Sequence, residues 1–235
     1  MVDSDKPDDA RGVQRTSPPS FRDGSLSHAV TAIELASGQA FTVHTDLLCY
    51  WSPKLRAMLA IKPPKVLRFA LDAKVFGIIV HWLYTAQLQD AWIRTTFPDP
   101  RIITVDGKED IEDPENYYRQ QAEYHALEIY IFATTYDIKA LRNDTVREIH
   151  KHSFVVSYAI VLKAYQHLPP ASLLLKYFVD QYARKYFEEL DSMYPGELAL
   201  REQLPNTFLV SWLLQVVNKT FEENKLVVDD YLEPM

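Results

Sequence analysis

FTVHTDLLCYWSPKLRAMLAIKPPKVLRFALDAKVFGIIVHWLY, residues Phe41–Tyr84, is the stretch of sequence that decides the fold. Its first residues alternate between apolar and polar, and residues 31–35 show the same alternation before a Gly-containing turn at 36–39. An alternation of period two is typical of strands, because successive side chains point to opposite faces. These two segments therefore predict a β-hairpin.

Two short helices are expected after the hairpin. Thr45 or Asp46 can cap the first, because a short side-chain oxygen satisfies the free N–H groups of a helix start. Ser52 and Pro53 suit the cap and the first position of a second helix. Pro63 and the proline after it are expected to end that helix.

The rest of the chain reads as one more strand followed by helices. Residues 66–71 predict the strand, and Asp72 is placed to cap the helix after it. That helix carries apolar residues at helical spacing, which are Phe76, Ile79, Val80, Leu83 and Tyr84. Further helices are expected at 116–136, 138–151, 155–167, 172–190 and 206–222. The predicted fold class is α+β, a small sheet packed with helices.

Composition divides the chain into five segments. We expect a disordered Ser-, Pro- and Asp-rich tail, a folded domain, an acidic insert within it, a helical extension and a frayed C-terminus. In that order, the tail spans 1–28, the domain 29–152, the insert 90–118, the extension 153–225 and the C-terminus 226–235. IITV at 102–105 could add a short strand to the insert.

Charge and cysteine content exclude several functions. The net charge of −7 and the absence of a basic cluster argue against nucleic acid or an anionic membrane as the partner. Cys49 is the only cysteine, so the chain can form neither an internal disulfide nor a cysteine-rich zinc site. The acidic start of the sequence and the lack of a long apolar run predict a protein of the cytoplasm or nucleus.

The residues that could carry chemistry are few and poorly spaced. His44 and Cys49 stand five apart and face different sides of a helix, so they do not form a nucleophile and its base. His150 and His152 diverge and have no third ligand nearby. The acids of 106–115 do not follow the spacing of a calcium loop and indicate a solvated loop or a docking patch for a basic partner. No catalytic, cofactor or metal site is assigned, and the chain is predicted not to be an enzyme.

Several motifs together resemble a known family, the BTB/POZ domain, and its fungal members in particular. The matching segments are FTVH at 41–44, DLLCYWSPKLRAML at 46–59, VFGIIVHWLYT at 75–85 and YIFATTYDIKALRNDTVREI at 130–149. LLLKYFVDQYA at 173–183 and LPNTFL at 204–209 are similar to the helical extension that often follows fungal BTB domains. The resemblance implies a BTB/POZ-like domain over 29–152 and a helical extension over 153–225.

The resemblance also implies a function: a non-catalytic protein–protein interaction module, acting as a scaffold or adaptor for other proteins. The sequence departs from the family at Thr45, where a basic residue is common, in the short AIKPPK link at 60–65, and at Gly77 and Ile78, where cullin adaptors often carry an acid. These departures lead us to expect a monomer or a weak homodimer.

Two alternative functions stay open. One is a substrate adaptor of a cullin-type ubiquitin ligase, with a cullin as partner. The other is a small-molecule or enzymatic pocket in the C-terminal helices, suggested only by aromatic residues at helical spacing, which are more often core. Those residues are Tyr177, Tyr182, Tyr186 and Trp212.

Overall fold

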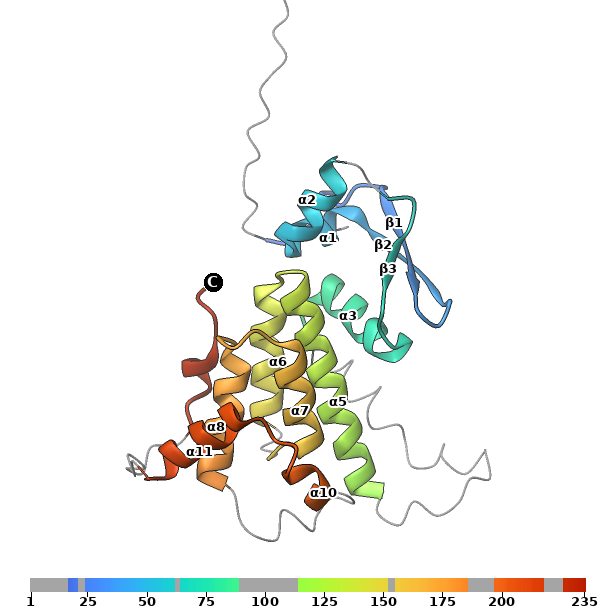
Figure 1. Cartoon of the computed structure of the whole chain (residues 1–235). Coiled ribbons are helices and arrows are strands. Elements are labelled where there is room, and N and C mark those ends of the chain that lie inside the picture. Colours follow the sequence, from blue (N-terminus) through green and yellow to red (C-terminus); the bar gives the residue numbers. More distant parts are fainter. Residues whose placement is uncertain are drawn as a thin grey trace, which may run out of the picture.

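The computed structural model describes residues 17–20, 24–61, 64–88, 114–151, 155–185, 197–217 and 226–235. Within these ranges the chain has the predicted α+β class, a small three-stranded sheet and a larger number of helices (Figure 1). The expected N-terminal tail up to residue 16 and the expected strand at 102–105 lie outside the described residues.

The sheet has the strand order β2-β1-β3. β1 (Val30–Leu35) and β2 (Ala40–His44) form the predicted antiparallel hairpin, with Ile33 opposite Phe41. Gly38 lies in the turn with a φ of +81°, a conformation that costs glycine little because it has no Cβ. β3 (Leu67–Phe69) pairs with β1 in parallel, so the strand predicted at 66–71 is confirmed in a shorter form.

α1 (Thr45–Trp51) and α2 (Pro53–Ile61) are the two predicted short helices. Ser52 caps α2 as expected, because its Oγ accepts a hydrogen bond from the Leu55 N–H at 2.9 Å. The same hydroxyl donates to the Tyr136 carbonyl, which lies between α5 and α6. Ser52 therefore ties the start of α2 to the helical part of the molecule.

The predicted cap of α1 is wrong. Thr45 is already the first helical residue, and the N-cap His44 makes no side-chain cap bond. The Thr45 hydroxyl instead lies 2.9 Å from the Thr31 hydroxyl, and the Asp46 carboxylate accepts from the Ser27 N–H at 2.7 Å. Both candidate caps are engaged by residues that precede the hairpin turn.

α3 (Ala73–Thr85) begins at the predicted cap, where the Asp72 carboxylate accepts from the Lys74 N–H at 2.7 Å. Its buried face is wider than the expected stripe, and Trp82 is its largest buried side chain. Tyr84, expected on the buried face, is instead 39% exposed. α3 contacts both α1 and α5, so it joins the sheet to the helices.

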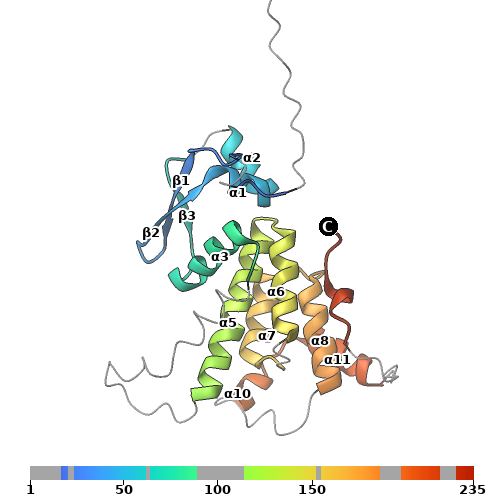
Figure 2. The same cartoon turned by 180° about the vertical axis from the view of Figure 1, so that it is seen from behind.

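The remaining elements are helical. They are α5 (Pro114–Thr135), α6 (Lys139–Lys151), α7 (Tyr158–His167), α8 (Leu173–Lys185), α10 (Glu197–Arg201), α11 (Asn206–Val217) and the 3-10 helix η2 (Val228–Tyr231). α5, α6, α7 and α8 lie side by side in both views, with the sheet and α3 at one end and α10 and α11 at the other (Figures 1 and 2). α10 was not predicted, and none of the described helices is long and apolar enough to cross a membrane.

Two predicted boundaries need correction. α5 begins at Pro114, inside the segment 90–118 that was expected to be a loop, because proline suits the first turn of a helix. The segment 226–235 was expected to be frayed. It instead forms η2 and buries Tyr231 to 4% exposure, so tertiary contacts hold it in place.

The hydrophobic core is continuous from the sheet to the last helices. One cluster of buried side chains includes Ile33 in β1, Phe132 in α5 and Phe208 in α11. It crosses the boundary expected near residues 152 and 153. The Lys54 ammonium adds a hydrogen bond to the Thr135 carbonyl at 2.7 Å, beside the bond from Ser52.

Candidate protein-interaction surface

α11 carries a row of exposed apolar side chains along one face, which we call the α11 stripe. Its members are Val210, Leu213, Leu214 and Val217, each between 54% and 65% exposed. Their spacing of i, i+3, i+4 and i+7 places them on one side of the helix. The stripe is therefore a contiguous apolar surface.

The opposite face of α11 attaches the helix to the bundle. Phe208 is completely buried, and its ring meets the rings of Tyr165 and Tyr182 edge to face at 5.9 and 5.3 Å. Trp212 is half-buried against Tyr182, with ring centroids 5.6 Å apart. Val216, one turn beyond Trp212, is exposed. α11 is thus apolar on two opposite faces, and the described part of the chain covers only one of them.

The surroundings of the stripe in the sequence are uncharged. No charged residue occurs between Glu202 and Lys219, although the chain carries 57 charged residues in total (25 basic and 32 acidic). α11 itself therefore contributes no charge that would attract phosphate groups or select a partner by ion pairs. What it offers a partner is apolar area and shape.

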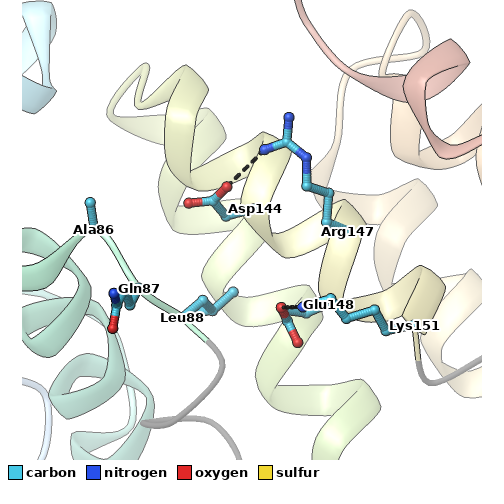
Figure 3. Close-up of a pocket in the computed structure, with 7 residues that line it drawn as sticks. All are labelled: Ala86, Gln87, Leu88, Asp144, Arg147, Glu148 and Lys151. Carbon is cyan, nitrogen blue, oxygen red and sulfur yellow. Dashed lines mark hydrogen bonds and ion pairs between the residues drawn. The ribbon is translucent and has the colours of Figure 1, made fainter.

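A separate pocket of about 390 Å³ lies between the end of α3 and α6 (Figure 3). It is lined by Ala86, Gln87, Leu88, Asp144, Arg147, Glu148 and Lys151. Its four charged side chains form two ion pairs along α6, Asp144 with Arg147 at 2.9 Å and Glu148 with Lys151 at 2.5 Å. The pocket therefore presents neutralised pairs to a ligand.

Asp144 has a second role in this pocket. Its carboxylate accepts a hydrogen bond from the indole N–H of the buried Trp82 at 2.9 Å. A buried indole N–H needs such a partner. The pair holds the end of α3 against α6, so this acid serves the fold.

The structure separates the residues that were considered as a nucleophile pair. His44 lies at the end of β2, and its Nδ1 is 2.6 Å from the Tyr84 hydroxyl of α3. Cys49 lies in α1 and is half-buried, and burial raises the pKa of its thiol. A raised pKa keeps the thiol protonated and unreactive near neutral pH.

The histidines and aromatics singled out in the later helices have core contacts. His150 lies beside Tyr177, with 3.4 Å between its Nδ1 and the hydroxyl, and burial lowers the pKa of its imidazole. Tyr177 and Tyr182 are buried in the core, whereas residues 152 and 186 lie outside the described part. Among the described residues, no group of three His, Cys, Asp or Glu is placed to hold a metal ion.

Neither a comparison with protein families nor a comparison with curated proteins finds a match for this chain. The function is therefore inferred from the residues and their geometry.

Proposed function

We propose that the chain is a non-catalytic protein-interaction module of the BTB/POZ type, acting as a scaffold or adaptor. The order of its elements supports this proposal: a hairpin, two short helices separated at Ser52, a third strand, α3 and then the pair α5 and α6. These elements coincide with the segments whose sequences resemble the family. The module binds other proteins through exposed helix faces, and it works in the cytoplasm or nucleus.

The α11 stripe is the observation that carries the proposal. Folded proteins that act alone rarely leave large contiguous apolar surfaces in contact with water, and such surfaces commonly mark sites of protein association. The four stripe residues expose more than half of their side-chain surface each, on a helix that is firmly anchored by Phe208. A rigid helix face of this kind is suited to docking, because little conformational freedom is lost on binding.

The chemistry of the stripe indicates the kind of partner. Aliphatic side chains on a helix that carries no charge fit the apolar face of a helix or an apolar groove on another protein. Binding to the stripe should depend only weakly on salt, since no ion pair contributes to it.

Paired aspartate substitutions test this proposal. The double variant L213D/L214D places two charges in the stripe without touching the buried face, and Leu198→Asp in α10 is the matched control, at 59% exposure. Proteins captured by the wild-type chain from cell extract, and identified by mass spectrometry, should be lost with the double variant and kept with the control. A partner purified after capture should bind the double variant at least about tenfold more weakly.

The possible outcomes distinguish docking of a partner on the α11 stripe from self-association through it. If partners bind the double variant as well as the wild type, the stripe is not the docking surface and the proposal loses its main support. Light scattering at micromolar concentration should show a monomer or a weak dimer. A stable dimer that the double variant abolishes would assign the stripe to self-association instead.

A further inference from the structure

The segment 226–235 docks on the helices in the way that a bound peptide would. It forms η2 and then continues in extended form along α6 and α8, toward the end of the bundle that faces the sheet (Figure 1). Its side-chain partners come from residues that are 51 to 92 positions earlier in the sequence. The segment is therefore held by contacts with residues of α6 and α8.

Asn143 recognises the backbone of this segment. Its Nδ2 donates to the Glu233 carbonyl at 2.9 Å, and its Oδ1 accepts from the Glu233 N–H at 2.8 Å. One side-chain amide thus pairs with both main-chain groups of one residue, as a neighbouring strand would. Asn143 is only 3% exposed, so its position is fixed by packing.

Arg142 recognises the carboxylate of the same residue. Its Nε and Nη2 lie 2.5 and 2.6 Å from the two carboxylate oxygens of Glu233, the bidentate geometry that suits guanidinium and carboxylate. The guanidinium is also held from the other side, by the Ala133 carbonyl at 2.9 Å and by Asp137 at 3.1 Å. These two contacts do not involve the docked segment, so the arginine is positioned independently of it.

Tyr231 is the second recognised residue. Its hydroxyl donates to Asp180 at 2.7 Å, and its ring packs edge to face on Tyr177 with centroids 5.1 Å apart. The ammonium of Lys176 lies 5.4 Å from the same ring. All three partners lie on α8, one turn or less apart. The surface therefore fits a tyrosine placed two residues before a glutamate.

We infer that Arg142, Asn143, Tyr177 and Asp180 form a binding site for a Tyr-x-Glu peptide segment of a partner protein, a site that residues 226–235 occupy within the chain itself. The inference rests on the proposed function, since it names a partner chemistry for a protein-binding module. Because the chain's own segment is tethered, its effective concentration is high, and a partner peptide competes against it. The site is consequently masked until a competing segment displaces the occupant.

The test uses the chain of 235 residues. The variant Y231S/E233K removes both recognised side chains from the occupant while leaving the site itself unchanged. The probe is a fluorescein-labelled peptide with the sequence of residues 226–235, LVVDDYLEPM, and binding is followed by fluorescence polarisation. We expect the probe to bind the variant at least about tenfold more tightly than the wild type, because the site is no longer occupied.

Substituted peptides provide controls that cannot disturb the fold of the protein. A probe with glutamine in place of the residue equivalent to Glu233, or alanine in place of Tyr231, should bind the variant about tenfold or more weakly, since hydrogen bonds to charged groups are lost. Equal binding of the three probes, or no binding to a variant with a native circular dichroism spectrum, would overturn the inference.

A second measurement uses the wild-type chain, so it applies even if Y231S/E233K does not fold. Excess unlabelled peptide, added to the wild-type chain, should accelerate hydrogen exchange at the amide of Glu233, and the glutamine peptide should not. Unchanged exchange would contradict the inference. A wild-type dimer that disappears in Y231S/E233K would show that the segment is exchanged between two copies of the chain. That result would also overturn the inference, because the site would then bind a second copy and not a partner protein. If the probe does not bind but partner capture still depends on the α11 stripe, the inference fails and the proposed function is retained.

Discussion

Ser52→Ala should destabilise the protein far more than its small change in volume suggests. Ser52 is completely buried and its hydroxyl makes two bonds, accepting from the Leu55 N–H at 2.9 Å and donating to the Tyr136 carbonyl. Alanine removes the helix cap, worth about 0.5–2 kcal/mol. It also leaves the part-buried Tyr136 carbonyl without this partner, which costs up to about 1–3 kcal/mol.

The two losses together predict a decrease of about 3 kcal/mol in the free energy of unfolding. For a chain of this size, that corresponds to a fall of about 6–12 °C in melting temperature. Urea unfolding followed by circular dichroism measures the first quantity, and calorimetry the second. The slope of the free energy of unfolding against urea concentration should be unchanged, because the same surface is exposed on unfolding.

Asp72→Ala is the matched control for this prediction. Asp72 also caps a helix, accepting from the Lys74 N–H at 2.7 Å, but it does so at the surface. Its loss should cost only about 0.5–1 kcal/mol. If the two variants were equally destabilised, or if Ser52→Ala cost less than about 1 kcal/mol, the bond to Tyr136 would not hold the two parts of the molecule together as we argue.

Three further results are expected. Burial lowers the pKa of His125, so folding favours the neutral imidazole; its contribution is complete above about pH 6.5 and is lost as the pH falls below that value. His125→Gln should therefore reduce the loss of stability between pH 7 and 5, measured by urea unfolding; an unchanged pH profile would contradict this. Trp82→Phe should cost about 1–3 kcal/mol, since Asp144 loses its indole partner, and thermal unfolding would show it. Cys49 should react with iodoacetamide at pH 8 more slowly in the folded than in the urea-unfolded chain, followed by mass spectrometry, because burial raises its pKa; equal rates would argue against that shift.

Features set by neighbouring residues could be predicted from the sequence. The hairpin follows from alternation on both sides of a turn, and the caps at Ser52 and Asp72 follow from residues one to three positions away. In each case the group that satisfies the backbone is close in the sequence. Local chemistry alone then decides the structure.

Features set by distant residues could not be predicted. The cap expected at Thr45 failed because Thr31 engages its hydroxyl, and only the sheet brings these two residues together. The order of the segment 226–235 likewise depends on Arg142 and Asn143, about ninety positions earlier. A segment of ten residues is shorter than the window over which apolar spacing is informative, so its sequence does not indicate such docking.

The α11 stripe was missed for a different reason. α11 is apolar over most of its circumference, apart from Thr207, Ser211 and Gln215, so its apolar spacing marks more than one face. Phe208 and Trp212, one turn apart, lie on the covered face, whereas Leu213 and Leu214 lie on the exposed one. A helix that is apolar on opposite faces is itself the signal that could have pointed to the stripe.

The mixed pairing of the sheet has a consequence for the order of folding. β1 and β2 are joined by a short turn, so their hairpin can form early from local contacts alone. β3 reaches β1 only after the intervening chain, including α1 and α2, has closed into a loop, which delays the parallel pairing. Substitutions that loosen the junction at Ser52 should therefore slow the addition of the third strand, and the rate of refolding would report on that junction directly.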